Sequence, residues 1–279
     1  MDKIKDFVAK LWQSLLSVVK VVLLSKWGIK WPDIDNERQQ RGIVILGNGP
    51  SLNDTVASAT DFLATHDLLA VNFAASTPLF NQLRPNYYLL ADPHFFKALD
   101  QPNVAKMWEA IANVDWDMHL FVPVNAVMPP LPANSKLTIS RYNTTPVEGF
   151  ASIENLLYRS ATGMPRPRNV LIPSIMAAIG MGYKHIYLAG ADHSWTRTLS
   201  VDDNNNVVSI QPHFYKEDDR EVQRSRTEYM HYPLHTIMYS FYVAFKSYFT
   251  IARYASHRGI EVINITPGSF IDAFPRQKV

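Results

Sequence analysis

From Gly42 to the carboxyl terminus, short runs of apolar residues alternate with longer segments of helical periodicity. Strands separated by helices pair in parallel, so this alternation predicts an α/β domain with a mostly parallel sheet flanked by helices. Its 279 residues, 47% of them apolar, suffice for one such domain. Strands are expected at 42–47, 68–71, 87–91, 119–124, 185–190 and 261–265. Helices are expected near 54–65, 104–112, 149–159, 171–182 and 234–258.

Charge and cysteine content exclude several classes of protein. Lys and Arg number 27 against 25 Asp and Glu, a net charge of only +2, and no basic block stands out. A nucleic-acid partner is therefore not expected. The absence of cysteine excludes disulfide scaffolds, thiolate zinc sites and cysteine nucleophiles, and it favours a reducing, cytoplasmic location.

The amino-terminal segment is apolar but differs from a signal peptide. Lys10, Lys20 and Lys26 interrupt the apolar run, and no small-residue cleavage site follows it. The segment is therefore interpreted as neither a signal peptide nor a spanning helix. We expect an appended helix and linker over residues 1–38, ahead of one catalytic domain over residues 39–279.

Apolar residues recur at helical spacing in this segment, which predicts an amphipathic helix. Tryptophans and lysines accompany them, as in helices that rest on a membrane surface. The partner predicted for residues 1–31 is the inner face of the cytoplasmic membrane. The alternative is packing on its own domain or on another subunit of a homo-oligomer. The apolar stripe consists of Ile4, Phe7, Val8, Leu11, Leu15, Val18 and Val22.

A long polar segment over about residues 194–230 interrupts the α/β pattern. It is weakly periodic, which is typical of a disordered insertion or of a lid over an active site. Its acidic clusters, Asp202–Asp203 and Glu217–Asp219, are most simply solvated.

Polar residues follow five of the predicted strands. Open α/β sheets bind ligands beyond the carboxyl ends of their strands, so these residues together predict a site, although each alone is compatible with a turn or a cap. They are Asn48, Asn72, Asp92, Asp192, and the pair Thr266 and Ser269.

The first of these stretches, "GNGPSL", resembles an anion-binding loop. Gly47 and Gly49 allow a close backbone approach, and Pro50 suits the first position of a helix whose positive end would face a phosphate. No Gly-Lys-Ser/Thr follows, so it is not a Walker loop. The dinucleotide fingerprint also fails, because its third glycine is missing and the second strand ends in Asn72, and NAD is not expected.

The candidate metal ligands are weak. Asp115 and Asp117 form a D-x-D pair, but they precede a strand rather than follow one, which favours a loop. His231 and His235 are four residues apart, yet Pro233 lies between them and is tolerated only at a helix start. No metal site is therefore expected.

The same proline suggests a role for the histidines. With a helix beginning near Pro233, His235 lies in the first turn, where the positive helix end favours a neutral imidazole. His235, with Tyr232 beside it, is the expected general base. A packing histidine and a metal pair are the alternatives.

Four stretches carry a resemblance to a known family: "IVILGNGPSL", "MGYKHIYLAGAD", "HYPLHT" and "NITPGSFIDAF". In order and approximate spacing, over about residues 42–276, the chain resembles the bacterial sialyltransferases of glycosyltransferase family 42. The resemblance implies a GT-A-like variant of a single Rossmann-like domain with a lid. It also implies inverting transfer from a CMP-activated nonulosonate to a hydroxyl of a glycan such as lipopolysaccharide or capsule, with no cofactor and no essential metal.

The resemblance also implies roles for particular residues. The catalytic set would be His235, Tyr232 and the lid residue Tyr215. The residues on the donor side would be Gly47, Asn48, Gly49, Pro50, Ser51, Asn72, Asp92, Asn169, Gly190, Asp192, Thr266, Pro267, Gly268 and Ser269. The chain departs from the family at Asp92, where the family has asparagine, and at Ser194 and Trp195, where it has a tyrosine. These departures suggest a different acceptor and leave the donor open.

Two other functions fit the same residues. A pyrophosphokinase-like enzyme acting on a pterin or another small alcohol would need magnesium, for which Asp92 and Asp192 are natural ligands. A non-catalytic assembly factor, anchored by the amino-terminal helix, would keep the strand-end residues for structural reasons.

Overall fold

The computed structural model of the protein describes residues 2–209, 214 and 229–279. Its centre is a parallel seven-stranded sheet in the order β5-β4-β3-β2-β1-β6-β9. This confirms the predicted α/β fold, and all six predicted strands are present. The strands are β1 (Ile43–Leu46), β2 (Asp67–Val71), β3 (Tyr87–Leu89), β4 (Met118–Pro123), β5 (Leu137–Tyr142), β6 (His185–Ala189) and β9 (Glu261–Asn264).

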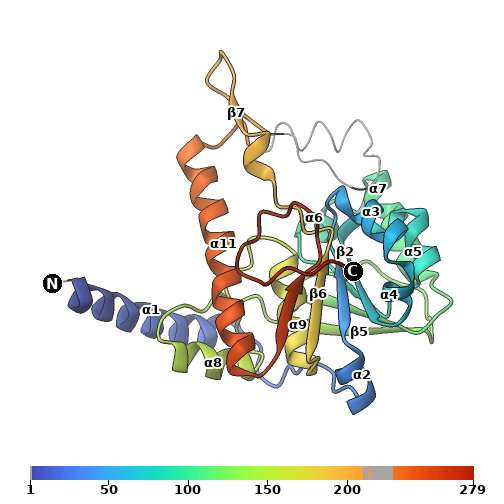
Figure 1. Ribbon diagram of the computed structural model, residues 1–279, viewed down its shortest axis with the longest axis horizontal. Coiled ribbons are helices and arrows are strands. Elements are labelled where there is room, and N and C mark those ends of the chain that lie inside the picture. Colours follow the sequence, from blue (N-terminus) through green and yellow to red (C-terminus); the bar gives the residue numbers. More distant parts are fainter. Residues whose placement is uncertain (1, 210–213, 215–228) are drawn as a thin grey trace.

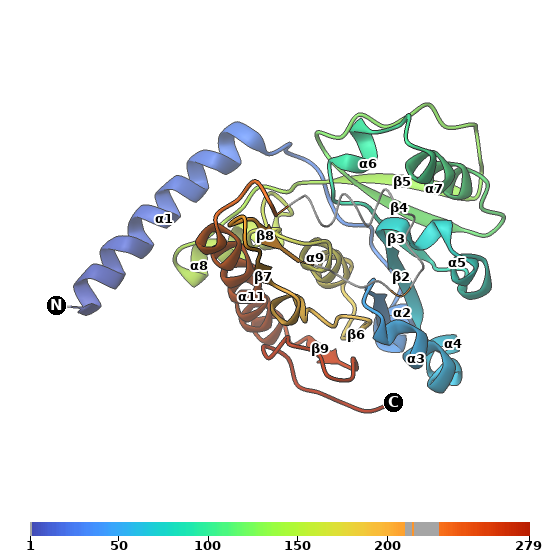
Figure 2. The same ribbon diagram turned by 90° about the horizontal axis from the view of Figure 1, so that it is seen from above.

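Helices cover both faces of the sheet (Figures 1 and 2). They are α1 (Asp2–Leu24), α2 (Asn36–Arg41), α3 (Ser51–Ser58), α4 (Thr60–Ala64), α5 (Pro78–Leu83), α6 (His94–Lys97), α7 (Pro102–Ala112), α8 (Ala151–Arg159), α9 (Leu171–Met181) and α11 (Leu234–His257). The short elements are the 3-10 helices η1 (Asn72–Ser76) and η2 (Trp195–Arg197) and the hairpin of β7 (Ser200–Val201) and β8 (Val207–Val208).

The sequence of β1 shows why both faces are covered. Ile43 and Ile45 join the core beneath α9 and α11, while Val44 and Leu46 join the opposite core with α3 and α4. All four side chains are buried. A strand that is apolar at every position is stable only between two layers, which is the usual situation of a parallel sheet.

The order of the strands creates a crevice at its centre. From β1 the chain builds β2 to β5 on one side and then returns to place β6 and β9 on the other. The loops that leave the carboxyl ends of β1 and β6 therefore diverge to opposite sides of the sheet. Such a switch point is where open α/β sheets bind their ligands.

The amino-terminal segment corrects the predicted division at residue 38. Val21 is 1% exposed and belongs to the main core, and Trp31 packs on Phe121 and Tyr142, with ring centroids 5.7 and 5.8 Å away. A side chain at Gly180 in α9 would overlap Trp31, with only 2.0 Å between the atoms. The end of α1 and the linker after it are therefore built into the α/β domain.

The rest of α1 behaves differently. The predicted apolar stripe is exposed, and the helix meets the domain through Ser14 and Ser17 instead. By length and mean hydropathy, 1.7 over Lys3–Leu24, this helix is long enough to cross a membrane, and 17% of the window is buried in the protein.

The polar segment after β6 is described only in part. Trp195 and Val207 pack against Ile237 and Phe241 of α11, so this part of the predicted insertion is attached to the domain. Asp202 accepts hydrogen bonds from the backbone N–H groups of the hairpin turn at 2.8 and 2.9 Å. Tyr215 and Glu217–Asp219 lie outside the described residues, and the lid stays a prediction.

Candidate functional site

A cleft of about 370 Å³ lies at the switch point. Its walls come from the loops after β1, β2, β3 and β6 and from the segment that leads into α9. Eight of the predicted donor residues line it, so the polar residues that follow β1, β2, β3 and β6 lie in one cleft. They are Asn48, Gly49, Pro50, Asn72, Asp92, Asn169, Gly190 and Asp192.

The loop after β1 needs glycine at two positions, because the loop after β6 approaches its backbone closely. The N–H of Gly47 donates to the carbonyl of Ala189 at 2.7 Å, and the N–H of Gly49 to that of Gly190 at 2.8 Å. A Cβ at Gly49 would lie 1.8 Å from the Asp192 carboxylate, and one at Gly47 would lie 2.5 Å from the Gly190 carbonyl. These two amides are therefore not available to an anion, which corrects the phosphate-loop expectation.

The start of α3 is also occupied. Ser51 donates its hydroxyl hydrogen bond to Asp192 Oδ2 at 2.7 Å, so an internal carboxylate lies at the positive end of the helix. The loop thus positions Asp192 at the cleft, and Ser51 supports Asp192 rather than lining the cleft.

Three asparagines in the cleft have buried polar atoms without a hydrogen-bond partner: Asn48 Oδ1, Asn72 Oδ1 and Asn169 Nδ2. A buried polar group without a partner costs about 1–3 kcal/mol, so native proteins keep few of them. Three of the five such atoms among the described residues lie in this cleft, the other two being Ser76 Oγ and His94 Nε2, which marks the cleft as a candidate ligand site.

Asn72 is held in a strained conformation. Its φ of 52° lies in the left-handed region, and the Tyr88 hydroxyl fixes it by donating to its carbonyl while accepting from Ala75 N. Strained residues persist where the surrounding structure fixes them, and they concentrate at functional sites.

The hydrogen bonds of Asn169 fix the orientation of its amide. Its Oδ1 accepts from the N–H of Leu171 at 3.0 Å and from the hydroxyl of Tyr248 at 2.9 Å. The Tyr248 oxygen must then accept from His193, whose Nε2 is 2.6 Å away. His193 is therefore protonated on Nε2, and its Nδ1 carries a lone pair.

His193 does not directly follow the end of a strand, and it is not among the site residues predicted from the sequence. It directly follows Asp192, has a φ of 50°, lines the cleft, and packs on Trp195 with ring centroids 4.1 Å apart. Burial lowers the pKa of His193 to about 3, which keeps the ring neutral at physiological pH. Its place after "AGAD" is the signal that could have identified it.

The charged groups of the cleft are few. Arg168 is the cationic side chain among the described residues that line it, opposed by Asp92 and Asp192. Asp92 accepts from the N–H of His94 at 2.8 Å. The D-x-D residues lie elsewhere, as predicted: Asp115 pairs with Arg84 at 3.0 Å and Asp117 with Lys136 at 3.1 Å, ahead of β4.

Other predicted residues are not brought to the cleft. Thr266 and Ser269 are buried and hold the β6 loop, with Thr266 Oγ1 accepting from Ala191 N at 3.0 Å and Ser269 Oγ donating to Ala191 O at 2.6 Å. Pro267 and Gly268 line a separate pocket of about 590 Å³ beside the carboxyl terminus. The expected contact of "TPGS" with the nucleotide stays a prediction, because these residues line no part of the cleft at the switch point.

The predicted base also lies outside the cleft. Pro233 precedes α11, as expected, but His235 and Tyr232 are exposed at the helix start and line no part of the cleft. The face of α11 that turns inward carries Ile237, Phe241 and Tyr248 instead.

No family model matches this sequence, and no curated protein matches it. Among solved structures, the chain is similar to the MAf glycosyltransferase from Magnetospirillum magneticum AMB-1, with a TM-score of 0.51 and 11% identity. The match covers 95% of this chain and 38% of that one, so the chain spans well under half the length of that protein. The likeness is one of fold: the two proteins share a Rossmann-like α/β architecture.

Proposed function

We propose that this protein is a glycosyltransferase whose cleft binds the nucleotide part of an activated sugar. The observation that carries the proposal is the set of three unsatisfied asparagine amides at the switch point. An amide offers both a donor and an acceptor, which suits the edge of a pyrimidine base and ribose hydroxyls. The likeness in fold to a glycosyltransferase supports the same class.

The proposed donor is a CMP-activated nonulosonate. Its nucleotide carries one phosphate, and among the described residues that line the cleft Arg168 is the one cationic side chain, near two carboxylates. A diphosphate or triphosphate would bring several negative charges to this arginine, whereas the phosphodiester of an intact CMP-sugar carries one. The proposed acceptor is a hydroxyl of a cell-surface glycan.

The proposed reaction is an inverting transfer without an essential metal. The acceptor oxygen bonds to the anomeric carbon as the bond from that carbon to the phosphate oxygen breaks, and CMP leaves with the electron pair. The acceptor proton passes to a base. His193 Nδ1 is the proposed acceptor of this proton, because it carries a lone pair and because Tyr248 and Asn169 fix the orientation of the ring. His193 thus takes the role that the sequence suggested for His235.

One observation favours a second candidate. Asp92 and Asp192 line the same cleft, as a magnesium-dependent pyrophosphokinase-like enzyme would require. That enzyme would bind a nucleoside triphosphate with the metal and would transfer a diphosphate to a small alcohol.

Release of CMP from a CMP-nonulosonate distinguishes these functions. We expect slow hydrolysis of the donor in the presence of EDTA, faster release with a glycan acceptor, and a loss of about 10²–10⁴-fold in His193→Asn. His235→Ala is the matched control and should keep near-normal turnover. Turnover of magnesium-bound ATP with an alcohol would favour the second candidate, and inactivity with both would favour an assembly factor.

A further inference from the structure

The outer face of α1 and the turn after it carry many exposed apolar side chains. Ten large apolar side chains between residues 4 and 27 are more than half exposed, although the helix is attached to the domain. They are Ile4, Phe7, Val8, Leu11, Trp12, Leu15, Val22, Leu23, Leu24 and Trp27. We call this set the α1 outer face. A patch of this kind on a soluble protein marks an interaction site.

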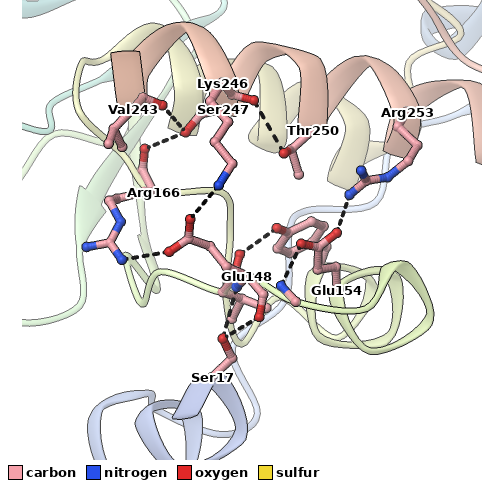
Figure 3. Close-up of polar contacts among 12 residues, drawn as sticks. Ser17, Glu148, Glu154, Arg166, Val243, Lys246, Ser247, Thr250 and Arg253 are labelled. Carbon is pink, nitrogen blue, oxygen red and sulfur yellow. Dashed lines mark hydrogen bonds and ion pairs between the residues drawn. The ribbon is translucent and has the colours of Figure 1, made fainter. Parts of the chain in front are cut away.

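Hydrogen-bonded serines fix the orientation of this face. Ser17 Oγ donates to the carbonyl of Glu148 at 2.8 Å and accepts from its N–H at 2.9 Å (Figure 3). Ser14 Oγ accepts from Phe150 N at 2.9 Å. Ser25 donates to Thr162 O at 2.6 Å. Ser14, Ser17 and the buried Val21 thus face the domain, and most of the α1 outer face is directed away from it. Phe7 lies at the edge of this face and also contacts Phe150, with ring centroids 5.4 Å apart.

Ion pairs stabilise the segment around Glu148, which contacts α1. Glu148 pairs with Arg166 at 2.6 Å and with Lys246 of α11 at 3.6 Å (Figure 3). Burial acts to raise the pKa of Glu148, but the hydrogen bond and charge of Arg166 hold it below its usual value. The Glu148 carboxylate is therefore ionised, so the segment that contacts α1 through Ser17 carries a charged side chain.

The charge of the chain is distributed unevenly. Residues 2–30 contain six lysines and two aspartates, a net charge of +4, whereas the whole chain carries +2. The remainder therefore carries −2. Positive charge and exposed tryptophans accompany the one large apolar surface of the amino-terminal segment, which matches anionic lipid headgroups above an acyl layer.

We propose that the α1 outer face docks on an anionic lipid bilayer, with the helix lying in the plane of the surface. A spanning orientation would draw the serine contacts, and with them Glu148, Arg166 and Lys246, into hydrocarbon, where charges are costly. A symmetric pairing of two copies would bring two segments of +4 together. Figure 1 shows α1 beside α8 at the lower left, whereas α3 and α6, which follow strands at the cleft, lie high in the molecule.

Vesicle co-sedimentation of the full-length protein tests this inference. We expect the protein to bind vesicles of equal parts phosphatidylglycerol and phosphatidylcholine more tightly than phosphatidylcholine alone, and to be released by alkaline carbonate. The triple variant Leu11→Gln, Leu15→Gln, Val22→Gln should bind more than about tenfold more weakly. Lys3→Gln with Lys5→Gln should lose about fivefold per lysine on anionic vesicles only.

A matched control replaces three exposed aliphatic residues away from α1, with Leu99→Gln, Val127→Gln and Val201→Gln. It should bind vesicles as the wild type does. Absence of binding by the wild type, or equal binding by the triple variant, would overturn the proposal. Resistance to carbonate would show a spanning helix. A dimer that ignores vesicles and dissociates in the triple variant would show that a second copy covers this face.

Discussion

At the scale of single residues, the cleft maintains features that cost stability. Asn72 combines a left-handed backbone with a buried, unsatisfied amide oxygen, and the other two asparagines each leave one buried polar atom unpaired. Such costs are expected where a ligand, rather than the protein, completes the structure.

Replacing Asn72 with glycine should separate stability from binding. Glycine adopts a φ of 52° without strain, so the free energy of unfolding should change by less than about 1 kcal/mol. Loss of the amide should weaken CMP binding by roughly fivefold to tenfold. Thermal denaturation and titration calorimetry measure the two effects.

Asn205 offers a matched control. It is also left-handed, with a φ of 61°, but lies exposed in the turn between β7 and β8. Asn205→Gly should leave CMP binding unchanged. Equal binding by Asn72→Gly and the wild type would remove Asn72 from the site.

His193 should make stability depend on pH. An unfolded histidine titrates near pH 6.5, whereas burial lowers the folded pKa of His193 to about 3. Below about pH 6.5 the unfolded state binds a proton that the folded state does not. The stabilisation is therefore complete above about pH 6.5 and declines as the pH falls towards 3, by up to about 1.4 kcal/mol per unit.

Urea denaturation of the wild type and of His193→Asn between pH 7 and about pH 4 measures this effect. Asparagine tolerates the left-handed backbone, and it removes this titration while leaving the other groups in place. The wild type should lose stability relative to the variant as the pH falls. Parallel curves for the two proteins would show that His193 is protonated in the folded state or accessible to solvent.

At the scale of elements, the sequence identified the strands that are buried on both faces and missed one at an edge. The all-apolar "IVIL" of β1 is recognisable, but β5, "LTISRY", pairs only with β4 and is mostly unburied, so its sequence carries little apolar signal. The start of α11 was predictable, because Pro233 directly precedes the helix and proline is tolerated only at a helix start.

The site was predictable in part, because its residues follow strands that can be recognised in the sequence. Residues that directly end β1, β2, β3 and β6 must meet at one edge, whatever the details of packing. Thr266 failed this rule because the hydroxyl turns inward to Leu188 and Ala191. His193 and Tyr248 come together from segments 55 residues apart, and that contact depends on tertiary packing rather than on a local pattern.

The attachment of α1 leads to a prediction about truncation. Removing residues 1–31 deletes Val21 and Trp31 from the core, at a combined cost of roughly 4–6 kcal/mol, which is comparable with the stability of a domain. We expect this truncation to unfold the protein. Removing residues 2–12 keeps the serine contacts and should leave a folded domain.

Circular dichroism melts of the two truncations compare them directly. An unchanged melting temperature after removal of residues 1–31 would restore the separate appendage that the sequence suggested. A collapse after removal of residues 2–12 would mean that the contact between Phe7 and Phe150, at 5.4 Å, matters more than the serines.

At the scale of the whole molecule, the cleft and the exposed face of α1 are two separate surfaces. The carboxyl edge of the sheet gathers the asparagines, His193 and Arg168 in one cleft, while the helix at the amino terminus presents an apolar surface beside α8. The charge network of Glu148, Arg166 and Lys246 links that helix to α11, whose Tyr248 reaches the cleft. Helix α11 thus contacts both the segment that holds α1 and the histidine of the cleft.

The most direct test of the proposed function is a calorimetric titration of the protein with CMP in buffer that contains EDTA. We expect one CMP to bind per chain, and Asn169→Ala to weaken it, because the described residues of the cleft provide amide partners for a nucleotide and Arg168 for its phosphate. Binding only of a nucleoside triphosphate with magnesium, or no heat with any nucleotide, would contradict it.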